Sequence, residues 1–227
     1  MQTLPGGISN KNWSLNQWNQ SIEEAVKNYP WINTWEIWNE PYVSMFQTGF
    51  ANGSAYNYYL LIESATKIIR KYQPNATIVC FGGAPIGSDS IFSWYKEVWN
   101  YGAGKYCNAI SLHIYPSLPF SSNQFGYWYA WINMTNKPIW ITEFGMPSSS
   151  LAIQGLSQGE QNYFLVNSFL FFSKIPYIKR AYWYDLWGLS DGQEENNFGF
   201  LNLTNPQGKP SEAWYSFLQI YNESLSA

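Results

Sequence analysis

Two glutamates stand out because each lies at the end of an apolar segment of the kind that forms a buried strand. Glu40 lies in Trp35–Pro41, which reads Trp-Glu-Ile-Trp-Asn-Glu-Pro, and Glu143 lies in Ile139–Pro147. Glu has a poor strand propensity and Pro cannot continue a sheet ladder, so both strands are predicted to end at these positions. In parallel α/β proteins ligands bind at this end of the strands. The two carboxylates are therefore candidates for a paired site.

A pair of carboxyl groups supplies the chemistry that hydrolysis of a glycosidic bond requires. One carboxylic acid protonates the leaving oxygen, and the second carboxylate acts on the other side of the anomeric carbon. A separation of about 5 to 5.5 Å makes the second carboxylate a nucleophile and retains the stereochemistry, whereas about 6.5 to 9.5 Å leaves room for a water and inverts it. The residue types predict this reaction and leave the stereochemical outcome open.

Four further residues lie at the ends of predicted strands and would adjoin the carboxylates: Asn39, His113, Tyr115 and Trp183. Asn39 could donate a hydrogen bond to a sugar 2-hydroxyl, and Tyr115 could hydrogen-bond Glu143 and keep it ionised. Trp183 would supply a flat ring on which a sugar stacks. Each has a structural alternative, because His113 could be a hydrogen-bonded core residue and Tyr115 and Trp183 could be packing residues.

The segments that would position these residues alternate between helix and strand. Helical spacing of apolar residues predicts helices over 15–28, 54–72, 90–99, 123–133, 157–173 and 211–222. Apolar runs predict strands over 33–39, 77–81, 108–115, 138–143 and 178–185. Such alternation predicts an α/β fold with a parallel sheet. Because polar residues occur at the same end of several strands, a (β/α)8 barrel explains the pattern better than a doubly wound sheet.

The composition favours an uncharged, hydroxyl-rich ligand such as a sugar. Charged residues make up 12% of the sequence and aromatic residues make up 20%. The chain has 227 residues, a length that suits one domain over 1–227. The net charge of -3 and the absence of a Lys/Arg cluster argue against nucleic acid as a partner. No apolar run is long enough to span a membrane.

Sequons and cysteines bear on the compartment in which the protein works. Seven Asn-x-Ser/Thr sequons favour a glycosylated, secreted protein, or else reflect a surface rich in Asn and Ser: Asn12, Asn19, Asn52, Asn75, Asn133, Asn202 and Asn222. Cys80 and Cys107 could form one disulfide or remain buried free thiols. Two cysteines cannot form a metal site by themselves, and we expect neither a metal nor a cofactor.

Four segments resemble, in order and spacing, strands four, six, seven and eight of the clan A glycoside hydrolases, which include family 5 cellulases and mannanases and family 39 enzymes. These segments are Trp35–Pro41, His113-x-Tyr115, Ile141-Thr-Glu143-Phe-Gly and Trp183. The resemblance implies a (β/α)8 barrel and a retaining mechanism with Glu40 as acid/base and Glu143 as nucleophile. It places four residues around the central sugar subsite, namely Asn39, His113, Tyr115 and Trp183. The implied substrate is a β-linked polysaccharide such as cellulose, xylan or mannan, cut in endo mode.

The chain departs from this family pattern before Trp35. The 34 preceding residues hold one predicted helix and too little sequence for three strand-helix units, so we expect a barrel without its first two to three units. This would be a fragment, or a natural short form whose open sheet edges are covered by self-association or by a complementing chain. A catalytically impaired carbohydrate-binding derivative and an α/β protein unrelated to carbohydrates are the alternatives to an active enzyme.

Overall fold

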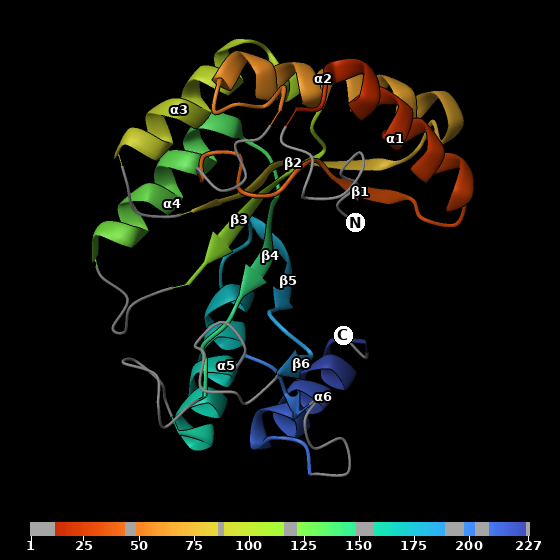
Figure 1. Ribbon diagram of the computed structural model, residues 1–227. Helices are drawn as coiled ribbons and strands as arrows, with labels where there is room; N and C mark the ends of the chain where they lie inside the picture. The colour runs from red at the N-terminus through yellow and green to blue at the C-terminus, as the bar shows by residue number, and fades with distance from the viewer. Residues whose placement is uncertain are drawn as a thin grey trace. The chain divides into compact units, whose positions relative to one another are not determined.

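The computed structural model describes residues 12–43, 49–85, 89–115, 122–148, 157–188, 198–202 and 209–225 (Figure 1). The chain forms two compact units. Unit 1 comprises residues 1–113 and 118–140, and unit 2 comprises residues 114–117 and 141–227. The expectation of a single domain over 1–227 stays a prediction. Within the described ranges, no helix combines the length and apolar character that a membrane span needs.

The observed elements follow the predicted alternation of helices and strands. The helices are α1 Leu15–Asn28, α2 Ala55–Tyr72, α3 Asp89–Asn100, α4 Ser122–Thr135, α5 Gln158–Ser173 and α6 Glu212–Leu225, with a short 3-10 helix over Ala103–Lys105. The strands are β1 Thr34–Glu36, β2 Thr77–Pro85, β3 Ala109–Ile114, β4 Ile139–Phe144, β5 Ile178–Trp183, β6 Trp187–Gly188 and β7 Leu201–Asn202. Helices α1 and α5 begin with capping boxes at Ser14 and Ser157.

The first five strands form one sheet in the order β1-β2-β3-β4-β5, and the boundary between the units falls within β4, after Trp140. Strand β1 pairs with β2 in parallel, and β2 pairs with β3 in parallel. Parallel neighbours in sequence order, separated by helices, are the pattern of part of a (β/α)8 barrel. The predicted α/β class and parallel pairing are therefore confirmed.

The ends of strands β1 and β2 differ most from the predicted ones. Strand β1 ends before the predicted residue 39, because Trp38 and Glu40 have positive φ angles of 69° and 40°, which a strand cannot contain. Strand β2 continues beyond the predicted residue 81 to Pro85, and its register against β3 shifts between Cys80 and Ala84. Such a register shift is the mark of a β-bulge. The first irregularity lies at a strand end that was predicted to carry site residues, and the second lies at the end of β2, where no site residue was predicted.

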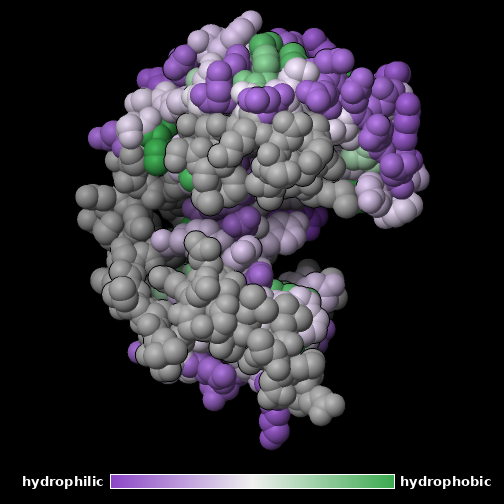
Figure 2. All heavy atoms as spheres, viewed as in Figure 1, coloured by the Kyte–Doolittle hydropathy of each residue, from purple (hydrophilic) through white to green (hydrophobic). Residues whose placement is uncertain are grey.

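Unit 1 has an aromatic core between its helices and strands. Figure 1 shows α1 to α4 along one side of β1 to β3. Among the fully buried side chains of this unit are Tyr58, Tyr95, Phe81 and Trp131. The two tyrosine hydroxyls donate to backbone carbonyls, at 3.0 Å from Tyr58 to Ile37 and at 2.7 Å from Tyr95 to Phe81. Each of these buried hydroxyls thus has a hydrogen-bond partner, as a stable core requires. On the outside, Figure 2 shows mostly hydrophilic residues over the outer helices.

Unit 2 has a separate core in which α5 and α6 pack against each other. Its buried centre consists of Leu165, Phe200 and Ala213. Around this centre lie partly buried apolar side chains from both helices, from β5 and from β7: Val166, Phe169, Trp183, Leu201, Trp214, Phe217 and Ile220. This second core fixes β5 and the residues that follow it.

Cys80 and Cys107 form a disulfide within unit 1, which resolves the alternatives of a bond and free thiols. Replacing both residues with Ala is expected to lower the free energy of unfolding by roughly 3 kcal/mol, because the bond restricts the unfolded chain over a separation of 27 residues. Urea denaturation of the double variant and the wild type measures this loss. As a control, a reductant should destabilise the wild type and leave the variant unchanged. Equal midpoints for the reduced and oxidised wild type would contradict the expectation.

Candidate active site

Glu40 lies in a tight turn that two other parts of unit 1 hold in place. The Glu40 N–H donates to the carbonyl of Gly82 at 2.5 Å. Two residues before it, the buried Trp38 ring packs against Trp13 and Trp18, with centroid distances of 5.0 and 5.5 Å. Bulky residues rarely adopt a positive φ, and such conformations persist where the surroundings enforce them. The turn therefore presents the Glu40 side chain in a conformation that an unsupported chain would avoid.

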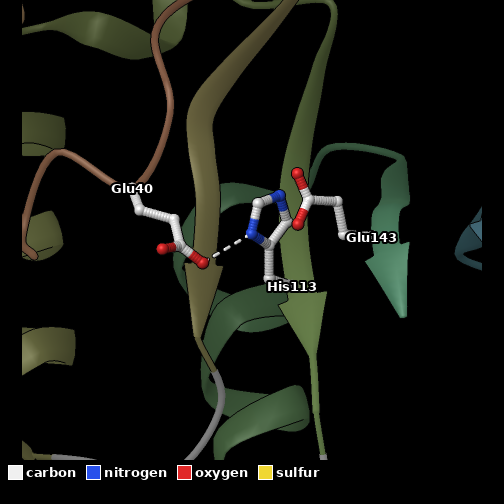
Figure 3. A group of neighbouring side chains, drawn as sticks. All are labelled: Glu40, His113 and Glu143. Atoms are coloured by element: carbon white, nitrogen blue, oxygen red, sulfur yellow. Dashed lines mark hydrogen bonds and ion pairs between the residues drawn. The ribbon is translucent and has the colours of Figure 1, made fainter. Parts of the chain in front are cut away.

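The Glu40 carboxylate is bonded to the chain's only histidine. His113 Nδ1 lies 2.7 Å from Glu40 Oε1 (Figure 3), and the imidazole is 4% exposed. An ionised carboxylate can only accept, so Nδ1 carries the proton whenever Glu40 is ionised. His113 is thus a buried, hydrogen-bonded residue, which fits the structural alternative, and its predicted place around the central sugar subsite stays a prediction. Its observed contact is with the catalytic candidate Glu40.

Asn39 lies in the same turn, directly before Glu40, and is half-buried. This position fits a role beside the carboxylate. The predicted hydrogen bond from Asn39 to a sugar 2-hydroxyl stays a prediction.

Glu143 lies near the end of β4 and accepts a hydrogen bond from Tyr115, and both residues belong to unit 2. The Tyr115 hydroxyl lies 2.8 Å from Glu143 Oε2, which confirms the predicted bond. The Tyr115 ring is 43% exposed. The ring makes T-shaped contacts with Tyr184 and Phe198, with ring centroids 6.2 and 5.7 Å apart. These rings hold the phenol beside the carboxylate and leave part of it open to solvent.

The Trp183 side chain has the contacts of a packing residue. Its indole N–H donates to the carbonyl of Phe198 at 3.1 Å, and its ring stacks on Phe200 with centroids 5.4 Å apart. The edge of Phe144 covers it at a centroid distance of 5.3 Å. These contacts fit the packing alternative, and the role of Trp183 as the ring on which a sugar stacks stays a prediction.

The next residue, Tyr184, is a better candidate for contact with a ligand. It is 37% exposed and packs edge-on against Tyr115. Successive side chains of a strand point to opposite faces, so Tyr184 and Trp183 face opposite ways if the strand geometry continues. The signal available in the sequence was this alternation. It was obscured because Tyr182, Trp183 and Tyr184 are three aromatic residues in a row.

Asp185, in unit 2, is a further carboxyl group near Glu143 that sequence reasoning missed. Its Oδ1 is buried and has no hydrogen-bond partner among the residues that the structure describes. Burial raises the pKa of Asp185 above its usual value, the nearby Glu143 carboxylate raises it further, and a bond from the backbone of Trp187 partly opposes the rise. Perturbed acids of this kind are common at functional sites.

Asp185→Asn is expected to raise the melting temperature at neutral pH. An acid whose pKa is raised in the folded state binds protons more tightly there, so stability falls as the pH rises through its titration. The amide of Asn does not titrate, so the variant should not lose folding stability in this way as the pH rises. The gain should be largest near pH 7 and should vanish as the pH falls below the ordinary Asp value of 3.8, which thermal unfolding across this range can measure. Asp89→Asn, at an exposed position in α3, is the control. A lower melting temperature for Asp185→Asn than for the wild type at pH 7 would contradict the expectation.

A comparison of the sequence with known families finds one match, to the family described as the glycosyl hydrolase catalytic core, over residues 8–217. No curated protein matches the sequence. The match agrees with the predicted class of enzyme, and it does not distinguish families 5 and 39 from other glycoside hydrolases.

Solved structures with similar folds are glycosidases from several families. A family 39 glycoside hydrolase from the gut symbiont Bacteroides cellulosilyticus WH2 has a TM-score of 0.65 and 19% identity over 88% of this chain and 44% of that one. An endo-β-1,3-glucanase of family GH128 from Amycolatopsis mediterranei has a TM-score of 0.58 and 19% identity over 90% of this chain and 76% of that one. A β-D-glucuronidase from Dictyoglomus thermophilum has a TM-score of 0.61 and 14% identity over 92% and 35% of the two chains.

These identities show similarity of fold alone. The chain spans 35% of the glucuronidase and 44% of the family 39 enzyme, so it corresponds to less than half of either structure.

Proposed function

Because the chain belongs to the glycosyl hydrolase catalytic core family, we propose that it is a retaining glycoside hydrolase that cleaves a β-linked polysaccharide in endo mode. The observation that carries the proposal is the hydrogen bonding of the two predicted carboxylates, Glu40 and Glu143. Each accepts a hydrogen bond from a residue that the sequence pattern assigned to the same site, Glu40 from His113 and Glu143 from Tyr115. Structural carboxylates that cap helices would have backbone N–H partners instead.

In the proposed first step, Glu143 attacks the anomeric carbon. A bond forms between the carboxylate oxygen and this carbon, the glycosidic C–O bond breaks, and Glu40 gives its proton to the departing oxygen. Tyr115 donates a hydrogen bond to Oε2 of Glu143 and so orients the carboxylate for the attack. The mechanism requires the two carboxyl groups to lie about 5 to 5.5 Å apart when substrate is bound.

In the second step, water hydrolyses the glycosyl ester. Glu40 accepts a proton from the water while the water oxygen bonds to the anomeric carbon. The bond between this carbon and Glu143 breaks, and Glu143 leaves as a free carboxylate. Both glutamates then return to their starting states, and the product keeps the β configuration. Neither step needs a metal or a cofactor.

Exposed aromatic rings favour a polysaccharide over a small glycoside. Tyr115, Tyr184 and Trp187 of unit 2 are 43%, 37% and 45% exposed. Aromatic faces bind the apolar faces of sugar rings without requiring charge, which suits the low charge of this chain. Cellulose, xylan and mannan are the proposed substrates, and β-1,3-glucan joins them because a similar fold belongs to an endo-β-1,3-glucanase.

We also propose that the protein works outside the cell. Disulfides persist mainly in oxidising compartments, and unit 1 contains a buried one between Cys80 and Cys107. The excess of sequons points in the same direction. Self-association remains a proposal that light scattering can test.

An activity screen with a stereochemical readout tests the proposed function. The protein is incubated with the four polysaccharides, reducing ends are measured, and proton NMR identifies the anomer that forms first. We expect reducing ends from at least one polysaccharide and a β product before mutarotation. A first-formed α product would overturn the retaining mechanism. Binding to a polysaccharide without release of reducing ends would instead favour the carbohydrate-binding alternative.

A further inference from the structure

We propose that Gly82 and Gly83, in the bulge of β2, are positioning residues that hold the Glu40–His113 pair in its bonded geometry. The effect on catalysis rests on the proposed role of Glu40 as acid/base. The effect on the His113 ring is independent of that role. Neither glycine was a candidate in the sequence analysis beyond its place at the end of a strand.

Gly82 allows the turn that carries Glu40 to approach β2 closely. Gly82 has a φ of +55°, and a Cβ atom there would lie 3.0 Å from the carbonyl oxygen of Trp38 and 3.2 Å from that of Ile37. Both neighbours are backbone atoms, which cannot move aside as the end of a side chain can. The Gly82 carbonyl also accepts the N–H of Glu40. Glycine is therefore required for this approach of the two segments.

Gly83 provides the surface on which the His113 ring lies. Its φ is +76°, and a Cβ atom would lie 2.1 Å from Nε2, 2.2 Å from Cδ2 and 2.3 Å from Cε1 of His113. The space that a methyl group would fill is thus occupied by the imidazole. Because the same ring bonds to Glu40 through Nδ1, moving it away from Gly83 would disturb that bond.

The bulge is fixed to the strand that carries His113. The Gly83 N–H donates to Ser111 Oγ at 2.8 Å, and this hydroxyl donates to the carbonyl of Cys80 at 3.0 Å. Ser111 is fully buried and lies two residues before His113 on β3. Side chains two residues apart on a strand share a face, so one face of β3 holds both the bulge and the ring.

A fixed His113 matters because an acid/base must present its proton at a defined point. With Oε1 of Glu40 bonded to His113, the other carboxyl oxygen is left to face the leaving group. Displacement of a catalytic group by about 1 Å can lower the rate about a hundredfold. The loss should appear in kcat rather than in KM, because the substrate contacts made by other residues remain.

Gly83→Ala tests the proposal by two independent readouts. We expect kcat on the best polysaccharide to fall by about tenfold to a hundredfold with little change in KM. The chain has one histidine, so a long-range ¹H–¹⁵N NMR spectrum of the imidazole reports on His113 alone. The Nδ1 signal should move in Gly83→Ala toward its position in Glu40→Gln. Gly126→Ala in α4 is the control, because among the described residues a Cβ there meets no atom within 4 Å beyond its own helix backbone and chain neighbours, and both readouts should stay as in the wild type.

A double variant separates displacement of the ring from general damage. His113→Ala removes the ring and leaves room for the methyl group, so Gly83→Ala should cost little further activity in that background. An equal fold-loss in both backgrounds, or a wild-type imidazole spectrum in Gly83→Ala, would overturn the proposal. Should Gly83→Ala fail to fold, Ser111→Ala removes the anchor of the bulge without adding atoms, and it should shift the same imidazole signals.

These outcomes distinguish the inference from the proposed function. If the wild type hydrolyses no polysaccharide, the spectrum of Gly83→Ala still decides whether the glycine positions His113. If the wild type is active and Gly83→Ala keeps both its kcat and its spectrum, the positioning role fails while the proposed function stands.

Discussion

Glu143→Gln is expected to abolish the release of reducing sugar, with kcat lowered on the order of 10⁴-fold or more, as removal of a covalent nucleophile does. The amide is nearly the same size as the carboxylate, and it can still accept the hydrogen bond that Tyr115 donates to this position. It cannot form the glycosyl ester. Affinity for oligosaccharide should therefore persist, and calorimetry on the inactive variant can measure it directly.

A smaller residue at the same position gives a positive test of the role of Glu143. In Glu143→Gly, added azide should enter the space that the carboxylate leaves and restore turnover of an activated β-glycoside, with an α-glycosyl azide as the product. Glu24→Gln, an exposed residue on α1, is the matched control and should keep full activity. Undiminished hydrolysis by Glu143→Gln would refute the nucleophile role of Glu143.

Loss of Glu40 is expected to depend on the leaving group, which distinguishes an acid from a nucleophile. In Glu40→Gln, cleavage of polysaccharide should fall by about 10² to 10⁴-fold, because the sugar oxygen leaves poorly without a proton. Aryl glycosides with acidic phenols need no such help, so formation of the glycosyl enzyme from them should be nearly unaffected. Hydrolysis of that intermediate should be slow, since no base activates the water.

The measurement is a series of aryl β-glycosides with leaving groups of graded acidity. For the variant, kcat/KM should rise steeply with leaving-group acidity, and for the wild type the dependence should be shallow. A uniform loss across the series would contradict the acid role and indicate a general structural effect. The imidazole spectrum of His113 provides a check on structure, because Glu40→Gln should change its Nδ1 environment while the rest of the chain stays folded.

The helices were predictable from the sequence because their signals are local. Ser14 and Ser157 each cap a helix through a residue three positions later, and the apolar spacing that follows lies within the same segment. The parallel sheet followed from the order of helices and strands. The candidate carboxylates were predictable for a similar reason, since a Glu at the end of an apolar strand is visible without knowledge of the fold.

The partners of these residues were less predictable because they come from distant segments. The turn that follows β1 is held by Gly82, about forty residues later, whose carbonyl accepts the N–H of Glu40. The contact of His113 with Glu40 depends on the bulge of β2. The Trp183 ring turned toward the core because Phe144 and Phe200 enclose it there. No pattern within 178–185 encodes which of its consecutive aromatic rings faces α5 and α6.

The left-handed backbone at Trp38 and Glu40 carries a cost in stability that has consequences for protein engineering. Non-glycine residues in such conformations cost about 1 to 3 kcal/mol each, and Gly or Asn would relieve much of this at position 40. A selection for heat resistance alone would therefore enrich changes at the proposed acid/base and yield robust proteins without turnover. Directed evolution of this chain should accordingly screen for hydrolysis in every round, or exclude position 40 from the library.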